Sequence, residues 1–190
     1  MNVFDKMLDN SAEFNEIISA AKIENFPIGI SGSADAQKAH LINSICKKLK
    51  KRAFVVTYND IQARRICEDL SFFSDNECVY IPPKEVVLYE VDASNHEIEN
   101  KRAAALGELS KGANAVLSVE SLLHFVAPKN EFDSMQMSFE YGGVTDASVL
   151  ADKLTKMGYT RVDVVNMQGQ FAIRGGIVDV FSPDALLPIR

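Results

Sequence analysis

Hydrophobic residues in the first two thirds of the chain form short apolar runs, separated by segments whose apolar residues recur at helical spacing. The apolar runs predict strands at residues 26–30, 53–57, 78–81 and 115–119. The periodic segments predict helices over residues 41–49, 60–73 and 95–109. Because strands that alternate with helices pair in parallel, we predict an α/β fold with a parallel sheet flanked by helices.

The two ends of the chain have different patterns. Residues 4–22 predict helical turns, with a break and a new helix cap at Asn10 and Ser11. After Ala127-Pro128-Lys129-Asn130 the pattern predicts a strand at 132–140, a helix at 146–157 and strands at 161–167 and 171–181. We therefore predict two domains, the sheet domain at residues 1–128 and a small α+β domain at residues 129–190.

Composition limits the function classes. The chain has 190 residues, 47% of them hydrophobic, and a formal net charge of -6, which argues against a nonspecific DNA-binding surface. The start of the sequence lacks a signal peptide and no run is long enough for a membrane span, so we expect a cytoplasmic protein without membrane contact. Cys46, Cys67, Cys78 and three histidines are too scattered for a disulfide framework, a metal site or a catalytic triad, and we expect no cofactor.

A glycine-rich segment lies between the first predicted strand and the next helix, where a phosphate-binding loop is found in P-loop proteins. The spacing from Gly29 to Ala36, a segment that includes Gly32, matches G-x-x-x-x-G-K-[ST], but Ala34, Asp35 and Ala36 occupy the glycine, lysine and hydroxyl positions. An aspartate in place of the lysine repels a triphosphate, so we predict that the segment does not support ATP hydrolysis. The alternative is a simple glycine-rich turn, with Asp35 interacting with the helix amino terminus.

The last twenty residues carry the second informative pattern, Phe171-Ala172-Ile173-Arg174-Gly175-Gly176-Ile177-Val178-Asp179-Val180-Phe181-Ser182-Pro183. Alternation along a strand places Arg174 on the face opposite Phe171 and Ile173, beside a turn or bulge at the two glycines. Asp179 lies between apolar neighbours, and we predict a structural carboxylate held by backbone donors rather than a catalytic group.

This pattern resembles a signature shared by transcription-repair coupling factors and the excision-repair subunit UvrB, and the resemblance covers roughly residues 25–190. The altered phosphate loop favours the coupling factors, because UvrB requires the lysine. The resemblance implies that residues 1–128 are a degenerate UvrB-like helicase domain and that residues 129–190 recruit UvrA. It also implies that the family's small module continues past the end of this sequence.

Further implications of the resemblance concern partners and site residues. Arg174 matches an arginine that contacts UvrA in the family, and Arg190 matches a second one. RNA polymerase binding and ATP-dependent DNA translocation are expected in later domains of the parent protein, so this part is expected to be no enzyme. Two alternatives stay open, an ATP-dependent UvrB-like DNA helicase subunit and a purely structural or autoinhibitory domain.

Overall fold

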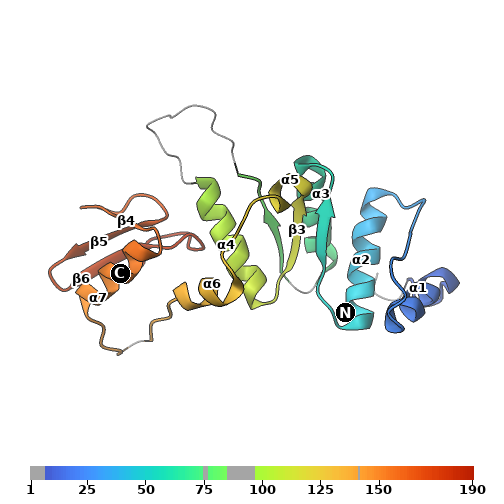
Figure 1. The fold of residues 1–190 in the computed structure, drawn as a ribbon, viewed down its shortest axis with the longest axis horizontal. Helices are drawn as coiled ribbons and strands as arrows, with labels where there is room; N and C mark the ends of the chain where they lie inside the picture. Colours follow the sequence, from blue (N-terminus) through green and yellow to red (C-terminus); the bar gives the residue numbers. More distant parts are fainter. Residues whose placement is uncertain (1–6, 75–76, 85–96, 141) are drawn as a thin grey trace. The chain divides into compact units, whose positions relative to one another are not determined.

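The computed structural model describes residues 7–74, 77–84, 97–140 and 142–190, which divide into two units (Figure 1). The first unit takes its described residues from Met1–Pro83 and Lys111–His124, and the second takes them from Lys84–Ser110 and Phe125–Arg190. Each contains one three-stranded sheet, parallel in the first unit and mixed in the second. The predicted fold class is confirmed, whereas the domain boundary at residue 128 stays a prediction.

The sheet of the first unit consists of β1 (Phe54–Thr57), β2 (Cys78–Ile81) and β3 (Asn114–Ser118), all parallel in the order β1-β3-β2. These three predicted strands are confirmed. Every residue of the central strand β3 is buried. Its polar Asn114 is accommodated because its side-chain oxygen accepts a hydrogen bond from the backbone N–H of Ala53 at 2.8 Å.

Helices cover this sheet in successive layers. Helix α3 (Asp60–Phe73) packs against all three strands, α2 (Asp35–Leu49) packs on α3, and α1 (Ala12–Lys22) packs on α2 (Figure 1). Ala39 of α2 and Ala63 of α3 are both fully buried, and such small side chains allow two helices to approach closely. A short helix, α5 (Val119–Leu122), follows β3 directly.

The predicted helix 60–73 is confirmed at both ends, and its start is fixed by Asn59. The Asn59 side chain accepts a hydrogen bond from the backbone N–H of Gln62 at 2.9 Å, which satisfies one of the unpaired donors of the first turn. We expect Asn59→Ala to lower the free energy of unfolding by about 1 kcal/mol, measured by urea denaturation. Asn59→Ser is the matched control and should stay close to the wild type, since serine also caps helices; equal losses in both variants would contradict a capping role.

The predicted strand at 26–30 is wrong. This segment is irregular and pairs with neither β1 nor β2, and the side chains of Phe26 and Ile30 are exposed. Pro27 has no backbone N–H to donate to a sheet, which weakens a strand that the apolar pattern alone favours. Among the flanking predictions, the helix after Ser11 is confirmed, while residues 4–6 lie outside the described part of the chain.

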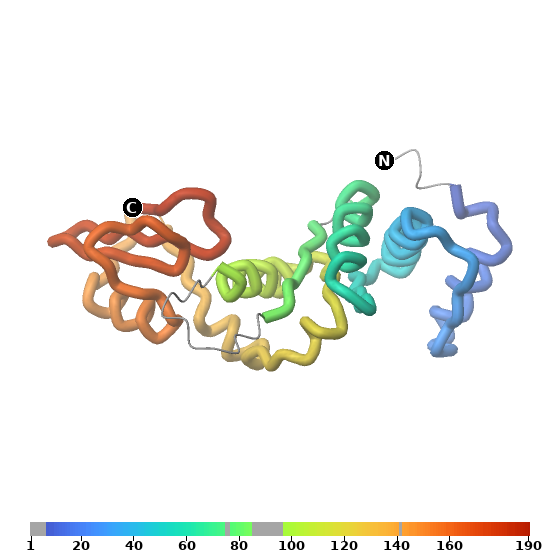
Figure 2. Tube along the Cα trace, turned by 90° about the horizontal axis from the view of Figure 1, so that it is seen from above, coloured from blue at the N-terminus to red at the C-terminus, as the bar shows by residue number. Residues whose placement is uncertain are grey.

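The second unit is built around β4 (Thr160–Arg161), β5 (Gln170–Arg174) and β6 (Ile177–Phe181). Strand β4 pairs with β5 in parallel, and β5 pairs with β6 as an antiparallel hairpin. Helix α7 (Ala147–Lys156) contributes Leu150 and Leu154, which form a core with Phe171 of β5. Figure 2 shows α7 running beside the hairpin. The predicted helix 146–157 is confirmed, with Asp146 as its cap.

Two further helices belong to this unit. Helix α4 (Glu97–Lys111) lies mostly within it and confirms the prediction for 95–109 where that range is described. Helix α6 (Lys129–Met135) occupies part of the range predicted as the strand 132–140, so that prediction is wrong. The helix is favoured by Pro128 at its amino-terminal cap and by the ion pair of Lys129 with Asp133 one turn later, at 2.5 Å.

The strands predicted at 161–167 and 171–181 also need correction. Only Arg161 of the first range lies in a strand, at the end of β4. The loop that follows is held by the side-chain oxygen of Gln170, which accepts hydrogen bonds from the backbone N–H groups of Asn166 and Met167. In the second range, the turn or bulge predicted at Gly175-Gly176 is confirmed as the turn of the β5–β6 hairpin, so the range contains two strands. Gly175 has a φ of +61°, the left-handed conformation that a two-residue hairpin turn needs at its first position.

Candidate partner-binding site

The β5–β6 hairpin has one buried face and one face that carries charge. Phe171 pairs with Val180 and Ile173 with Val178, and all four side chains pack in the core beside α7. On the opposite face, Arg174 pairs with Ile177 and Asp179 with Ala172. Arg174 and Asp179 are therefore diagonal neighbours on one face, within reach of each other. The predicted direction of Arg174, away from Phe171 and Ile173, agrees with this register.

Arg190 reaches the same face through the returning end of the chain. Val180 and Ile189 form an antiparallel bridge with two backbone hydrogen bonds, of 2.9 and 2.8 Å. Since Asp179 precedes Val180 and Arg190 follows Ile189, the antiparallel register places Arg190 opposite Asp179. Segments that are distant in the sequence thus bring both predicted arginines to one carboxylate.

The three side chains form a compact ionic cluster, which we call the Arg–Asp–Arg cluster (Arg174, Asp179 and Arg190). Arg174 Nη2 lies 2.6 Å from Asp179 Oδ2, while Arg190 donates through Nε to Oδ1 at 2.8 Å and through Nη2 to Oδ2 at 3.3 Å. The side chain of Asp179 is only 11% exposed, whereas those of Arg174 and Arg190 are 52% and 68% exposed. The carboxylate is sheltered and both guanidinium groups face solvent.

The cluster alters the acid–base properties of its members. Hydrogen bonds from Arg190 and then from Arg174 hold the pKa of the Asp179 carboxyl below its ordinary value. The same contact with Asp179 raises the pKa of Arg190 above its ordinary value. Asp179 is therefore ionised at neutral pH. The cluster carries one net positive charge in a protein whose overall formal charge is -6.

Comparison with known proteins bears on the region that contains this cluster. Residues 137–190 match the family model of the UvrB interaction domain. The transcription-repair-coupling factor of Bacillus subtilis is 26% identical over 196 residues, which cover 100% of this chain. Its counterpart in Staphylococcus epidermidis is 28% identical over 180 residues, which cover 93% of this chain. The predicted resemblance to the coupling factors is confirmed. The matched regions make up 16% and 15% of these coupling factors, so this chain spans a small part of their length.

The match to the UvrB interaction domain covers α7 and the whole β4–β6 sheet, and so includes all three members of the Arg–Asp–Arg cluster. The sequence predicted that donors hold the Asp179 carboxylate, and it does accept hydrogen bonds; that its role is structural rather than catalytic stays a prediction. The donors, however, are the two guanidinium groups, where the sequence predicted backbone N–H groups. The diagonal pairing follows from period-two alternation across the two-residue turn at Gly175-Gly176, but the sequence predicted a turn or bulge there without fixing the register of the two strands.

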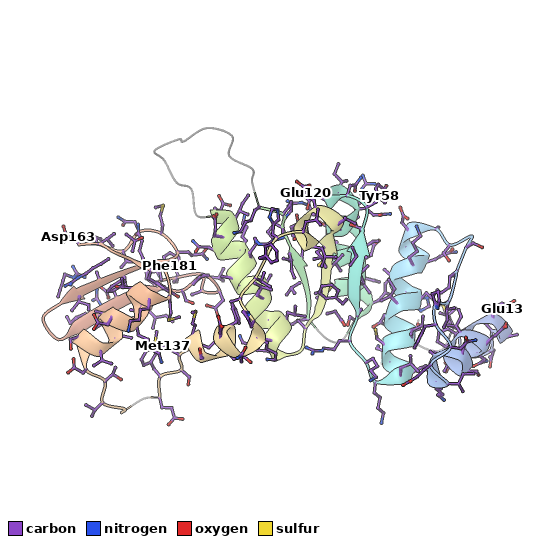
Figure 3. All side chains as sticks on the ribbon, in the orientation of Figure 1. Glu13, Tyr58, Glu120, Met137, Asp163 and Phe181 are labelled. Carbon is purple, nitrogen blue, oxygen red and sulfur yellow. The ribbon has the colours of Figure 1, made fainter. Side chains whose placement is uncertain are left out.

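Two open pockets adjoin the cluster and share Arg174. The larger has a volume of about 490 Å³ and is lined by Arg161, Val162, Asp163, Ile173 and Arg174. The second, of about 320 Å³, is lined by Val164, Val165, Arg174, Asp179, Pro188 and Arg190. Figure 3 shows Asp163 on the loop that follows β4 and Phe181 at the end of β6. The arginines thus stand beside apolar side chains, a setting that strengthens ionic contacts once a partner excludes water.

The lowered pKa of Asp179 leads to a prediction about acid. Asp179 favours the folded state above its unfolded pKa of about 3.9, and this contribution disappears as pH falls through the lower folded-state value. The difference in unfolding free energy between wild type and Asp179→Asn should therefore be constant above about pH 5 and shrink below about pH 4. Urea denaturation of both proteins across this range measures it. A difference that grows on acidification would contradict the lowered pKa.

The altered phosphate loop lies in the first unit, and its predicted residues are placed as follows. Gly29 and Gly32 lie in an exposed irregular segment, and added Cβ atoms there would meet nothing within 4 Å. Ala34 is the cap of α2, where its backbone N–H donates to the Gln37 side chain at 3.0 Å. Asp35 forms an ion pair with Lys38 at 2.8 Å, and Ala36 is exposed on the first turn. That this loop lacks nucleotide-binding function stays a prediction.

The cysteines and histidines contribute no further site in the described residues. Cys46, Cys67 and Cys78 are free thiols, although the sulfur atoms of Cys67 and Cys78 lie 3.6 Å apart in the first core. Within the described ranges, no three His, Cys, Asp or Glu side chains gather in an arrangement that suits a metal ion. Nor does any described helix have the length and apolar character needed to span a membrane.

Proposed function

We propose that this chain is a non-catalytic docking module of a transcription-repair coupling factor and that its residues 137–190 bind UvrA. The observation that carries the proposal is the Arg–Asp–Arg cluster on the solvent-facing side of the UvrB interaction domain. Planar guanidinium groups suit bidentate recognition of carboxylates, so the surface fits an acidic patch on a partner protein.

The wider role follows from the same proposal. By holding UvrA, the module brings the damage-recognition protein to a stalled RNA polymerase during transcription-coupled nucleotide excision repair in the cytoplasm. Contacts with RNA polymerase, DNA translocation and ATP turnover are assigned to later domains of the longer parent protein. The negative formal charge of the chain is consistent with DNA being held elsewhere.

Isothermal titration calorimetry of the chain with purified UvrA tests the docking proposal. We expect saturable binding that weakens as salt is raised, because the contacts are ionic at their rim. Absence of binding at protein concentrations of tens of micromolar would refute the proposal for this chain.

The competing function is that of an ATP-dependent UvrB-like helicase subunit. It is favoured by the parallel sheet and by the glycine-containing loop before α2. Titration with ATP and magnesium separates the two. Because Asp35 takes the place of the phosphate-binding lysine, we expect no binding in the micromolar range. Clear magnesium-dependent binding at those concentrations would favour the helicase function.

A further inference from the structure

The hydrogen-bond donors of the two site arginines are unequally used. A guanidinium group has five N–H donors. Arg190 donates to Asp179 through Nε and Nη2, whereas Arg174 donates to it through Nη2 alone. Both side chains remain more than half exposed. Each arginine is thus held on one side by Asp179 and keeps donors for another acceptor, and Arg174 keeps the larger share.

Stability alone gives a poor account of this arrangement. Exposed ion pairs contribute little to folding, and a sheltered carboxylate loses hydration that its partners must compensate. The sheet already has an apolar core on its other face, formed by Phe171 with Leu150 and Leu154. The measurable consequence of the cluster is instead geometric, because two long and flexible side chains are held at a fixed separation on one surface.

We propose that Asp179 is a positioning residue, which orders Arg174 and Arg190 in advance so that together they receive carboxylate groups of the partner. The inference rests on the proposed docking function and adds the chemistry of the surface that binds. The partner's surface is an acidic patch, in which Arg174 holds one carboxylate bidentately. Apolar side chains of the partner next to that carboxylate cover the pocket that Pro188 lines. Ordering before binding raises affinity because the side-chain entropy is lost in advance.

The direction in which one substitution changes the affinity for UvrA separates positioning from simple charge attraction. Asp179→Asn keeps the shape of the side chain and raises the net charge of the cluster by one. If the partner were attracted only by positive charge, binding to an acidic patch would tighten. Because positioning is lost, we expect binding to UvrA to weaken about tenfold, measured by calorimetry on the full chain.

Asp152→Asn is the matched control. It removes the same charge from an exposed position on α7 in the same unit, and Asp152 lines neither pocket and forms no ion pair with either arginine. Its affinity for UvrA should equal that of the wild type or be slightly higher. A double-mutant cycle adds a second control: in the Arg174→Ala, Arg190→Ala background, Asp179→Asn should have almost no further effect.

Nuclear magnetic resonance of the arginine side chains tests positioning without UvrA. In the wild type, the Nε–H of Arg190 should exchange slowly with water and give a sharp resonance, because it donates to Asp179 Oδ1. In Asp179→Asn this protection should be largely lost, while urea denaturation and backbone spectra confirm the fold.

The outcomes are distinguishable. If the wild type fails to bind UvrA but the Nε–H result holds, the docking proposal fails and the ordering of the arginines by Asp179 stands. Unchanged Nε–H exchange in Asp179→Asn, or binding as tight as in the wild type, overturns the positioning role.

Discussion

Phe171→Ala is expected to cost about 3–5 kcal/mol of unfolding free energy and to release the β4–β6 sheet from α7. The Phe171 side chain is 0% exposed and lies with Leu150 and Leu154 in the small core beside the β4–β6 sheet. A domain of this size buries little apolar surface, so such a loss approaches its whole stability. Urea denaturation should show an earlier transition, and binding to UvrA should be lost with the fold.

Phe139→Ala provides the control for this effect. It makes the same chemical change in the same unit, but the Phe139 side chain is 61% exposed. The loss of unfolding free energy should therefore stay within about 0.5 kcal/mol. Equal effects in the two variants would mean that Phe171 is not the centre of the second core.

The strands and helices that were predicted correctly are those whose sequence pattern and tertiary environment agree. The apolar run of β3 is buried along its whole length, as expected for the central strand of a parallel sheet. Helix α3 has both a capping residue, Asn59, and apolar residues at helical spacing. Local preference and burial point the same way in these elements, so the sequence is sufficient to predict them.

The wrong predictions concern segments in which alternation or hydrophobicity lacks a pairing partner. Residues 26–30 are apolar but do not join the sheet, and the alternating Met135, Met137 and Phe139 fall across the end of α6. A strand is stable only when another strand satisfies its backbone groups, and no local pattern reports where that partner lies. The loop after β4 illustrates the same point, because the Gln170 side chain replaces a neighbouring strand there.

The candidate site was predictable in its residues but not in its geometry. Alternation around Phe171 was enough to predict that Arg174 points away from the core. The resemblance to the coupling factors indicated Arg190 as a second site residue. Their meeting at Asp179 depends on the bridge between Val180 and Ile189, which forms only when the chain end folds back on β6. A contact of this kind arises from tertiary structure, so the sequence pattern predicted the wrong hydrogen-bond donors for Asp179.

Arg174→Ala should weaken binding to UvrA by about 2 kcal/mol or more, hence at least tenfold, while the chain stays folded. The Arg174 side chain lines both pockets of the site, is half exposed and keeps most of its N–H donors for a partner. Truncation therefore removes a contact from the centre of the proposed interface without opening the core, which lies on the other face of β5.

Substitution by lysine isolates the part played by the planar group. Arg174→Lys keeps the charge but loses the paired donors, and we expect an affinity between those of the wild type and Arg174→Ala. Arg65→Ala, an equivalent truncation of an exposed arginine on α3 in the first unit, should leave binding unchanged. Calorimetry gives the affinities and circular dichroism checks the fold. Wild-type affinity in both Arg174 variants would remove this residue from the interface, and a lowered melting temperature in Arg174→Ala would show that its bond to Asp179 serves the fold instead.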